Sequence, residues 1–414
     1  MLLVTLGTAG DLVPFLALGK GLRERGHDVT VLGNGYYRET ALREGLAFVD
    51  LCSADEHRKR TQQRSRWTRL RAAREGGQNL LEDLPRVYDA VTAHYVRGET
   101  VVAASGLMFG ARIAQEKLGL PLATVHLYPR CFRSLDDPLF WPRWLPRPIR
   151  RLWLRMADRV IHRHLGGGIN AFRGRLGLPP VASLLRWWHS PQLVLGLFPE
   201  WLSPPQGDWP ANTVLTGFAR YDALEAFGED RELEAFLSAG EPPLVFSHSS
   251  AVADAPFFFA ASAAIAERLG RRAILLTPRR EQLPQPLPPN VRHFSFVPHS
   301  RLLPRAAALV HHGGINSAGQ ALAAGIPQLL VPMFLDQPDN GRRLRRLGVA
   351  ATVRPSAYRP RLIARRLRQL LDSPSVAERC RFFAARLREE NAVEKACDAL
   401  ERLYAESVGN RTEA

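Results

Sequence analysis

The sequence has few cysteines and no long apolar run, and each absence excludes a class of protein. Its four cysteines (Cys52, Cys131, Cys380 and Cys397) have neither CxxC spacing nor the density of a disulfide scaffold, which argues against a structural zinc site and suits a reducing cytosol. No segment reaches the roughly 18 uninterrupted apolar residues that a membrane span needs. The N-terminal "MLLVTLGTAGD" has no basic leader, so we expect a first strand there and not a signal peptide.

Acidic residues are outnumbered: 40 Asp and Glu against 56 Lys and Arg give a formal net charge of +16. A basic surface favours anionic partners such as nucleic acid, acidic lipid or phosphate-bearing small molecules, although an arginine excess can equally reflect codon usage. No nucleic-acid recognition motif accompanies the charge, so we expect no nucleic-acid partner. The hydrophobic content of 46% and charged content of 23% are typical of a globular protein.

The order of apolar runs predicts an α/β protein of two doubly wound halves. Strands are expected at 2–6, 28–34, 47–51, 100–105, 122–128 and 193–198, the last of the first half, and then at 243–249, 272–277, 293–297, 308–312 and 328–333. Helices are expected between them, and also over 137–189 and 375–404. Such alternation predicts parallel sheets with helices on both faces and a ligand cleft at the carboxyl ends of the strands.

The length of 414 residues suits two domains. Residues 204–219 are rich in Pro, Gly and Asn, which is typical of a linker. We therefore predict an N-terminal domain over 1–203, a linker over 204–219, a C-terminal domain over 220–385, and a C-terminal helix within 386–414 that packs back toward the N-terminal domain.

The stretch "HHGGINSAGQALAAGIPQLLVPMFLDQPDN" (311–340) carries the strongest functional signal. Gly313 and Gly314 permit a tight turn, Asn316 or Ser317 can cap the next helix, and Gly325 can end it. A helix N-terminus at the carboxyl edge of a sheet is an anion site. The alternative is an ordinary strand-to-helix turn without a ligand.

A carboxylate and an amide, Asp336 and Gln337, follow the next strand of this stretch. Side by side they offer both acceptors and donors, which suits the reading of neighbouring hydroxyls. Their alternative role is to cap the helix that follows. A phosphate pocket beside a hydroxyl-binding pair suggests a nucleotide-activated sugar.

This stretch resembles the donor-binding signature of the family-1 glycosyltransferases, whose GT-B fold has two Rossmann-like domains facing a cleft. The resemblance implies that domain 1–203 binds the acceptor and that domain 220–385 binds a UDP- or dTDP-sugar donor. It places His312 at the diphosphate, Asn316 and Ser317 on phosphate oxygens, and Asp336 and Gln337 on sugar hydroxyls. Gln320 stands where a glutamate often contacts the ribose. The full set of implied donor-binding residues is Gly10, Ser250, Val297, His312, Gly313, Gly314, Asn316, Ser317, Gln320, Asp336 and Gln337.

Three of these residues come from other segments, and Gly10 is the one in the N-terminal turn. "FVPHSRLLPRAAALVHHGG" resembles the segment that stacks on the base, with Val297 supplying backbone hydrogen bonds. The loop "FSHSSAV" occupies the place of a Gly-Ser phosphate loop, and Ser250 lies in it, with Ser249 where a glycine is usual.

The N-terminal turn "LGTAGDLVPFLALG" lacks the third glycine of a dinucleotide fingerprint, and Asp11 stands at its mouth. Asp before an early helical proline is often an N-cap. The motif "GDLVP" is similar to the bacterial antibiotic and sterol branches of the family, where the aspartate acts as the base. This resemblance implies that Asp11 deprotonates an acceptor hydroxyl in an inverting, in-line displacement that needs no metal and no further cofactor.

The middle segments "GARIAQEKLGLP", "WWHSPQLVLGLFPEWLSPPQGDWP" and "LTGFARYDAL" resemble the rhamnosyltransferases of rhamnolipid synthesis, which implies a hydrophobic or lipid-like acceptor. Residues 141–164 interleave Trp and Arg, and their helical spacing suits peripheral contact with an anionic membrane. The alternative is a helix that lines the acceptor pocket or packs on the sheet. Two other functions stay open: a nucleotide-sugar 2-epimerase of the same architecture, and a catalytically silent nucleotide-binding helper.

Overall fold

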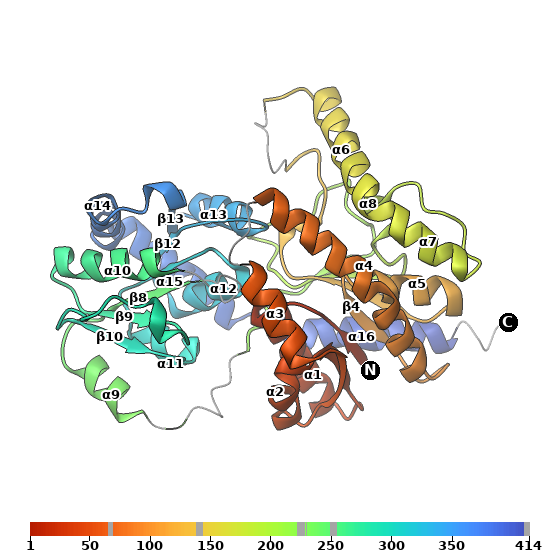
Figure 1. Ribbon diagram of the computed structural model, residues 1–414, viewed down its shortest axis with the longest axis horizontal. Helices are drawn as coiled ribbons and strands as arrows, with labels where there is room; N and C mark the ends of the chain where they lie inside the picture. The colour runs from red at the N-terminus through yellow and green to blue at the C-terminus, as the bar shows by residue number, and fades with distance from the viewer. Residues whose placement is uncertain (65–68, 138–143, 222–227, 229, 249–254, 410–414) are drawn as a thin grey trace. The chain divides into compact units, whose positions relative to one another are not determined.

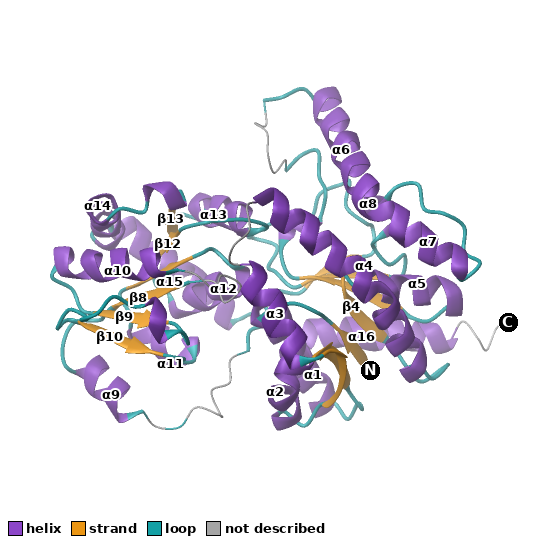
Figure 2. Cartoon of the chain, viewed as in Figure 1, coloured by secondary structure: helices purple, strands orange, loops and turns teal. Residues whose placement is uncertain are grey.

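The structure, a computed structural model, describes residues 1–64, 69–137, 144–221, 228, 230–248 and 255–409. The chain divides into two compact units (Figure 1). The first contains Met1–Gln63, Trp67–Ala219 and the C-terminal segment from Asn391 on, and the second contains mainly Arg220–Glu390. Each unit contains one parallel β-sheet with helices on both faces (Figure 2).

The first sheet has seven strands in the order β3-β2-β1-β4-β5-β6-β7, and every neighbouring pair is parallel. The order reverses between β1 and β4. The central strands are buried on both faces, as expected for a parallel sheet covered by helices. The strands are β1 (Leu2–Val4), β2 (Thr30–Asn34), β3 (Ala47–Cys52), β4 (Val102–Ser105), β5 (Leu122–His126), β6 (Leu193–Gly196) and β7 (Thr213–Leu215).

The helices of the first unit include two long ones that follow β3. These cover a stretch to which the sequence patterns assigned no element. The helices are α1 (Ala9–Glu24), α2 (Arg38–Arg43), α3 (Ala54–Arg64), α4 (Arg69–His94), α5 (Phe109–Leu118), α6 (Arg147–Ile161), α7 (Gly167–Arg175), α8 (Leu184–Trp187) and α16 (Ala392–Gly409). A π-helical turn, His162–Gly166, joins α6 to α7.

The second sheet has six strands in the order β10-β9-β8-β11-β12-β13, again all parallel, and its order reverses between β8 and β11. The strands are β8 (Leu244–Ser247), β9 (Ala273–Leu276), β10 (Val291–Phe294), β11 (Ala308–His311), β12 (Gln328–Leu330) and β13 (Ala350–Thr352). The helices are α9 (Arg231–Ser238), α10 (Pro256–Leu269), α11 (His299–Leu302), α12 (Ile315–Ala324), α13 (Gln337–Arg346), α14 (Pro360–Leu371) and α15 (Pro374–Arg388).

The C-terminal helix α16 belongs to the first unit and packs against α1. Gly21 permits the close approach, because a Cβ there would lie 2.5 Å from Cγ1 of Val393. Arg25 pairs with Asp398 at 2.6 Å and with Glu401 at 2.8 Å. An apolar contact and a cluster of ion pairs therefore hold α16 to the start of the chain.

Three expectations about elements were wrong in detail. The last strand of the first sheet is β7, inside the segment 204–219, because "TVL" between Asn212 and Thr216 pairs with β6 despite its turn-rich surroundings. The helical stretch predicted over 137–189 is broken at 176–183, where Gly177 has φ +72 and two prolines follow. The strand expected at 293–297 begins earlier, at Val291, which pairs with Ala273.

Candidate active site

Both groups of predicted residues lie where a sheet reverses its strand order. Asp11 follows β1, which neighbours β4 at the reversal of the first sheet, and His312 follows β11, which neighbours β8 at the reversal of the second. Helices leave the sheet in opposite directions on either side of such a point, and ligands of doubly wound folds bind there, at the carboxyl ends of the strands. Each unit therefore presents its predicted residues at the edge where a ligand is expected.

In the first unit, the carboxylate of Asp11 is fixed by the first turn of α1. Its Oδ2 accepts hydrogen bonds from the backbone N–H of Thr8 (2.8 Å) and from the Thr8 hydroxyl (3.2 Å). Thr8 is the N-cap and Asp11 the third helical residue, so the two form a capping box. The expectation that Asp11 could be the N-cap was wrong, although its carboxylate does contribute to helix initiation. Gly10 is exposed in the same turn.

Two side chains, one at the end of β2 and one just after it, complete this turn, and the sequence patterns had not indicated either. Asn34 is buried and its Nδ2 donates to the carbonyl oxygen of Gly7 at 2.8 Å. The Tyr37 hydroxyl accepts a hydrogen bond from the backbone of Ala9. Burial raises the pKa of Tyr37, and the neighbouring Tyr36 and Asp11 raise it further, so the phenol stays protonated at neutral pH.

A cluster of histidine and aromatic rings lies at the end of β5, at the same carboxyl edge. His126 is 2% exposed, and its ring centroid lies 5.0 Å from that of His189, 5.1 Å from Phe132 and 5.4 Å from Trp188. The Nε2 atoms of both histidines are buried without a hydrogen-bond partner in the described part of the chain. Burial lowers the pKa of His189 to about 4 and holds that of His126 well below its ordinary value, so both rings are neutral at pH 7.

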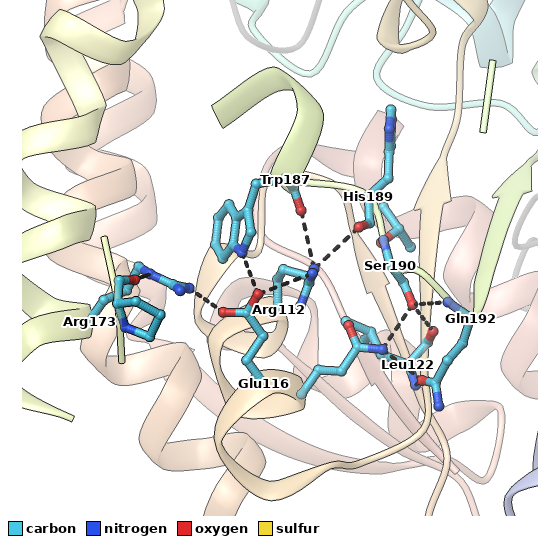
Figure 3. Close-up of polar contacts among 11 residues, drawn as sticks. Arg112, Glu116, Leu122, Arg173, Trp187, His189, Ser190 and Gln192 are labelled. Carbon is cyan, nitrogen blue, oxygen red and sulfur yellow. Dashed lines mark hydrogen bonds and ion pairs between the residues drawn. The ribbon is translucent and has the colours of Figure 1, made fainter. Parts of the chain in front are cut away.

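Hydrogen bonds on both sides of His189 hold it in place (Figure 3). Arg112 donates from Nε to the carbonyl oxygens of Trp187 and His189, both at 3.2 Å. Ser190 donates to the carbonyl oxygen of Leu122 at 2.6 Å. The carboxylate of Glu116 accepts from the Trp187 indole at 2.8 Å. The segment that carries His189 is thus fastened to α5 and to β5, and its position is fixed.

In the second unit, His311 locks the double-glycine turn, a role that the sequence patterns did not reveal. This fully buried residue accepts the N–H of Gly313 on Nδ1 (3.2 Å), and Nε2 lies 3.0 Å from Oε1 of Gln328 on β12. The proton therefore resides on Nε2. Burial lowers the pKa of His311 to about 4, so this neutral tautomer persists at pH 7. Gly313 has φ +93, where a side chain would be strained.

The ring of His312 lies over the start of α12. A Cβ on Gly314, the N-cap of this helix, would be 2.5 Å from Nε2 of His312. Nδ1 is buried without a partner in the described residues, and burial lowers the pKa well below its ordinary value. A neutral imidazole and the N–H groups of the first helical turn thus lie together, an arrangement suited to an anion.

Asn316 and Ser317 are the second and third residues of α12, so neither caps it; that expectation was wrong. Both are half-buried, as is Gln320 one turn further on. As predicted, α12 ends at Gly325. This residue has φ 72, a left-handed conformation that glycine adopts without steric cost because it has no Cβ.

Asp336 and Gln337 begin α13 and are tied to the glycine turn through Asn340. The Nδ2 of Asn340 donates to the carbonyl oxygen of Gly313 (3.0 Å) and to Oδ2 of Asp336 (2.6 Å). Oε1 of Gln337 accepts the N–H of Met333 at 2.8 Å, which leaves its amide nitrogen as the donor. Asp336 occupies the N-cap position, but its side chain makes no capping hydrogen bond.

The other predicted residues are less informative. The side chain of Val297 is 1% exposed in the core, so only a backbone contact with a ligand is compatible with its position. The preceding Phe296, which begins the predicted base-binding segment, is 55% exposed. Ser250 lies outside the described residues.

Within the described residues, no three His, Cys, Asp or Glu side chains gather as metal ligands would. No helix in the described part of the chain is long and apolar enough to cross a membrane.

Comparisons with known proteins agree with this geometry. Residues 1–135 match the glycosyltransferase family 28 N-terminal domain, and residues 270–400 match the erythromycin biosynthesis protein CIII-like C-terminal domain. O-mycaminosyltylonolide 6-deoxyallosyltransferase of Streptomyces fradiae is 30% identical over 409 residues, covering 96% of each chain. Sterol 3-beta-glucosyltransferase of Pichia angusta is 24% identical over 98% of this chain and 34% of its own length.

Among solved structures, the glycotransferase of kitacinnamycin matches with a TM-score of 0.74 and 21% identity, covering 97% of this chain and 98% of the other. The protein therefore has two Rossmann-like α/β units, each with one parallel sheet and with predicted site residues at the reversal of strand order. This architecture is the GT-B fold. The chain belongs to the family-1 glycosyltransferases.

Proposed function

We propose that the protein transfers a hexose, of the glucose or rhamnose type, from a UDP- or dTDP-sugar to a hydroxyl of a hydrophobic or lipid-like acceptor. The anomeric centre is inverted and no metal is required. One observation carries the proposal: the acidic side chain of Asp11 and the start of α12 after its double-glycine turn each lie at the order reversal of a separate sheet. General-base and leaving-group functions are therefore available from different units.

The second unit binds the donor. The diphosphate is held by the N–H groups at the start of α12, by Asn316 and Ser317, and by the neutral ring of His312. Neutral histidine can donate to an anionic oxygen from whichever nitrogen carries its proton. Gln320 contacts the ribose, and Asp336 and Gln337 bind the sugar hydroxyls.

The nucleobase stacks on Phe296 while the backbone of Val297 bonds to its edge. This arrangement is supported by the exposure of the Phe296 ring and the burial of the Val297 side chain. Ser250 adds a phosphate contact, and Gly10 lets the turn before Asp11 approach the donor closely.

Asp11 acts as the base. As the acceptor oxygen attacks the anomeric carbon, the hydroxyl proton passes to the Asp11 carboxylate and the bond to the diphosphate oxygen breaks. The α12 dipole stabilises the negative charge of the departing nucleoside diphosphate. The capping box around Thr8 supports this role, because it holds the carboxylate in one orientation before substrate arrives.

The first unit receives the acceptor. Support comes from the ring cluster at the end of β5, which combines apolar aromatic surface with neutral histidines. Such a lining favours an uncharged, hydroxylated and largely apolar molecule over an acidic one.

The test begins with thermal shifts against a panel of UDP- and dTDP-sugars, since a ligand at about a hundred times its dissociation constant stabilises by roughly 2.7 kcal/mol. Transfer to hydroxylated lipids is then measured with the donor that binds, and the anomeric configuration of the product is determined by NMR. Asp11→Asn and Asp11→Ala should abolish transfer while donor affinity stays within about twofold.

Three outcomes would count against the proposal. Unchanged turnover in Asp11→Asn would remove this residue from the mechanism. A product with retained configuration would exclude the in-line displacement. An epimerised donor formed without any acceptor would favour the 2-epimerase, and donor binding without either reaction would favour the silent helper.

A further inference from the structure

The helix α6 carries an apolar stripe that faces solvent. Ile149, Leu152, Trp153, Met156 and Val160 follow one another at intervals of one, three or four residues, so they share one side of the helix. They are 42% to 56% exposed, and none of the residues of α6 is buried. The alternative that this apolar face packs on the sheet therefore does not hold.

The opposite side of α6 is held to its unit by polar contacts. Asp158 accepts from the Ser183 hydroxyl at 2.5 Å and from the N–H of Leu185 at 3.3 Å. Arg133 donates to the carbonyl oxygen of Leu154 at 3.0 Å. These contacts fix the orientation of the helix, and the apolar stripe on its other side faces solvent. Figure 1 shows α6 and α7 as a rod that extends beyond the first sheet.

A row of arginines runs beside the stripe. Arg155, Arg159 and Arg163 are spaced by four residues and all are exposed, and the row approaches the stripe toward its C-terminal end. Arg151 stands two turns before Asp158 and so shares the side of the helix that faces the unit. The single acidic residue of α6, Asp158, faces the other way and is engaged by Ser183 and Leu185. A second apolar ring, Trp144, is 78% exposed just before the helix. Apolar and cationic groups are therefore presented together on one surface.

We propose that this surface, defined by the stripe and the arginine row of α6, docks on the headgroup region of an anionic phospholipid bilayer. An amphipathic helix with such a face lies in the plane of the interface, with its apolar residues about 5–10 Å into the headgroup boundary. Tryptophan favours that depth. Each arginine near an anionic leaflet contributes about 1 kcal/mol, which raises the affinity about fivefold.

The same charges argue against a second copy of this chain as the occupant. Two copies that buried their stripes against each other would bring both arginine rows together at one interface, where like charges oppose association. Docking does not depend on sugar transfer. The docking proposal can therefore fail while the proposed function stands, and the proposed function can fail while docking stands.

The experiment is flotation of the full chain with vesicles of phosphatidylglycerol and phosphatidylcholine, and with phosphatidylcholine alone. The charge variant is Arg155→Glu/Arg159→Glu/Arg163→Glu. Its matched control is Arg361→Glu/Arg365→Glu/Arg368→Glu, which reverses three exposed arginines of α14 and alters the net charge equally. The apolar variant is Leu152→Ser/Trp153→Ser/Met156→Ser, which keeps every charge. Circular dichroism checks the fold of each.

We expect wild type and the α14 control to float with the anionic vesicles only, and less at high salt. Both α6 variants should lose affinity by about 100-fold or more. Brominated lipid should quench wild-type fluorescence, and Trp153→Phe should reduce that quenching.

Equal flotation of the two charge variants would overturn the proposal, because binding would then follow net charge alone. So would the absence of wild-type flotation. A mass that rises with protein concentration and returns to the monomer value in the apolar variant would assign the stripe to self-association instead.

Discussion

The carboxylate of Asp11 lies directly over the Cα of Gly7: a Cβ on residue 7 would be 2.2 Å from Oδ2. Gly7 also has φ +145, a conformation that residues with side chains rarely adopt. The position of the proposed base therefore requires glycine at residue 7, four positions before Asp11, because any side chain there would collide with the carboxylate.

We predict that Gly7→Ala lowers kcat by about 100-fold or more, because the methyl group must displace the carboxylate and a misplacement of about 1 Å can cost that much. Nucleotide affinity should stay within about twofold, since the implied diphosphate contacts lie in the second unit. Gly26→Ala is the matched control: Gly26 has φ +87, but a Cβ there would meet no atom within 4 Å. Equal losses in both variants would show that backbone strain, and not the position of Asp11, is responsible.

The contact between Gly314 and His312 predicts a coupled effect on nucleotide binding. Gly314 has φ −62, which alanine adopts readily, so Gly314→Ala acts through the His312 ring alone. We expect it to weaken binding of dTDP or UDP by about tenfold, measured by calorimetry. In a His312→Ala background the same change should cost little, giving a coupling of about 1 kcal/mol or more. Additive losses would mean that the two residues act independently.

The exposed ring of Phe296 predicts a loss of nucleotide affinity on its removal. Stacking of a base on an aromatic side chain is worth about 1–3 kcal/mol by alanine substitution, so Phe296→Ala should weaken binding about 5- to 150-fold. Phe382→Ala, which removes a ring of 50% exposure from α15 in the same unit, should leave affinity unchanged. Unaltered affinity in Phe296→Ala would exclude stacking there.

The buried histidines predict that the first unit loses stability in acid. The pKa of His189 is about 4 in the fold against an ordinary 6.5, so unfolding takes up a proton between those values. The contribution of neutral, buried His189 to the free energy of unfolding is therefore fully present above pH 6.5. It falls as the pH drops toward 4, by up to about 3 kcal/mol in total. His189→Phe keeps an aromatic ring without a titrating group and should flatten this fall.

Tryptophan fluorescence measures this unit selectively, because all eight tryptophans precede residue 210. Urea unfolding at pH 7.5 and pH 5 gives the comparison, with exposed His94→Phe as the control that should keep the wild-type dependence. If the stability of His189→Phe falls with pH as steeply as that of the wild type, then other buried groups cause the acid sensitivity, and His126 is the first candidate.

Much of the two-sheet fold and both glycine turns could be predicted from local sequence, because glycines, short apolar strands and helix stops act over a few residues. Gly325 ended α12 as predicted. Other features depend on distant partners. His311 locks the turn only because Gln328 lies on the neighbouring strand, and Asn34 reaches Gly7 only because β2 pairs with β1.

The missed elements have a similar origin. The helix α3 reads "ADEHRKRTQQR", which has no apolar period to detect. The strand β7 has three residues in a turn-rich segment and is defined by its pairing with β6. The role of Thr8 as N-cap could have been found, because Thr followed three residues later by an acidic side chain is a capping-box pattern.

The return of α16 to the first unit has a consequence for engineering. The second unit is built mainly from one continuous stretch, Arg220–Glu390, whereas the first is assembled from both ends of the chain. A hybrid protein that exchanges the second unit must therefore be spliced at two junctions, near residues 220 and 390. A single crossover near 220 would match a foreign C-terminal helix to Gly21 and Arg25, and the native partnership of α1 with its own tail would be lost.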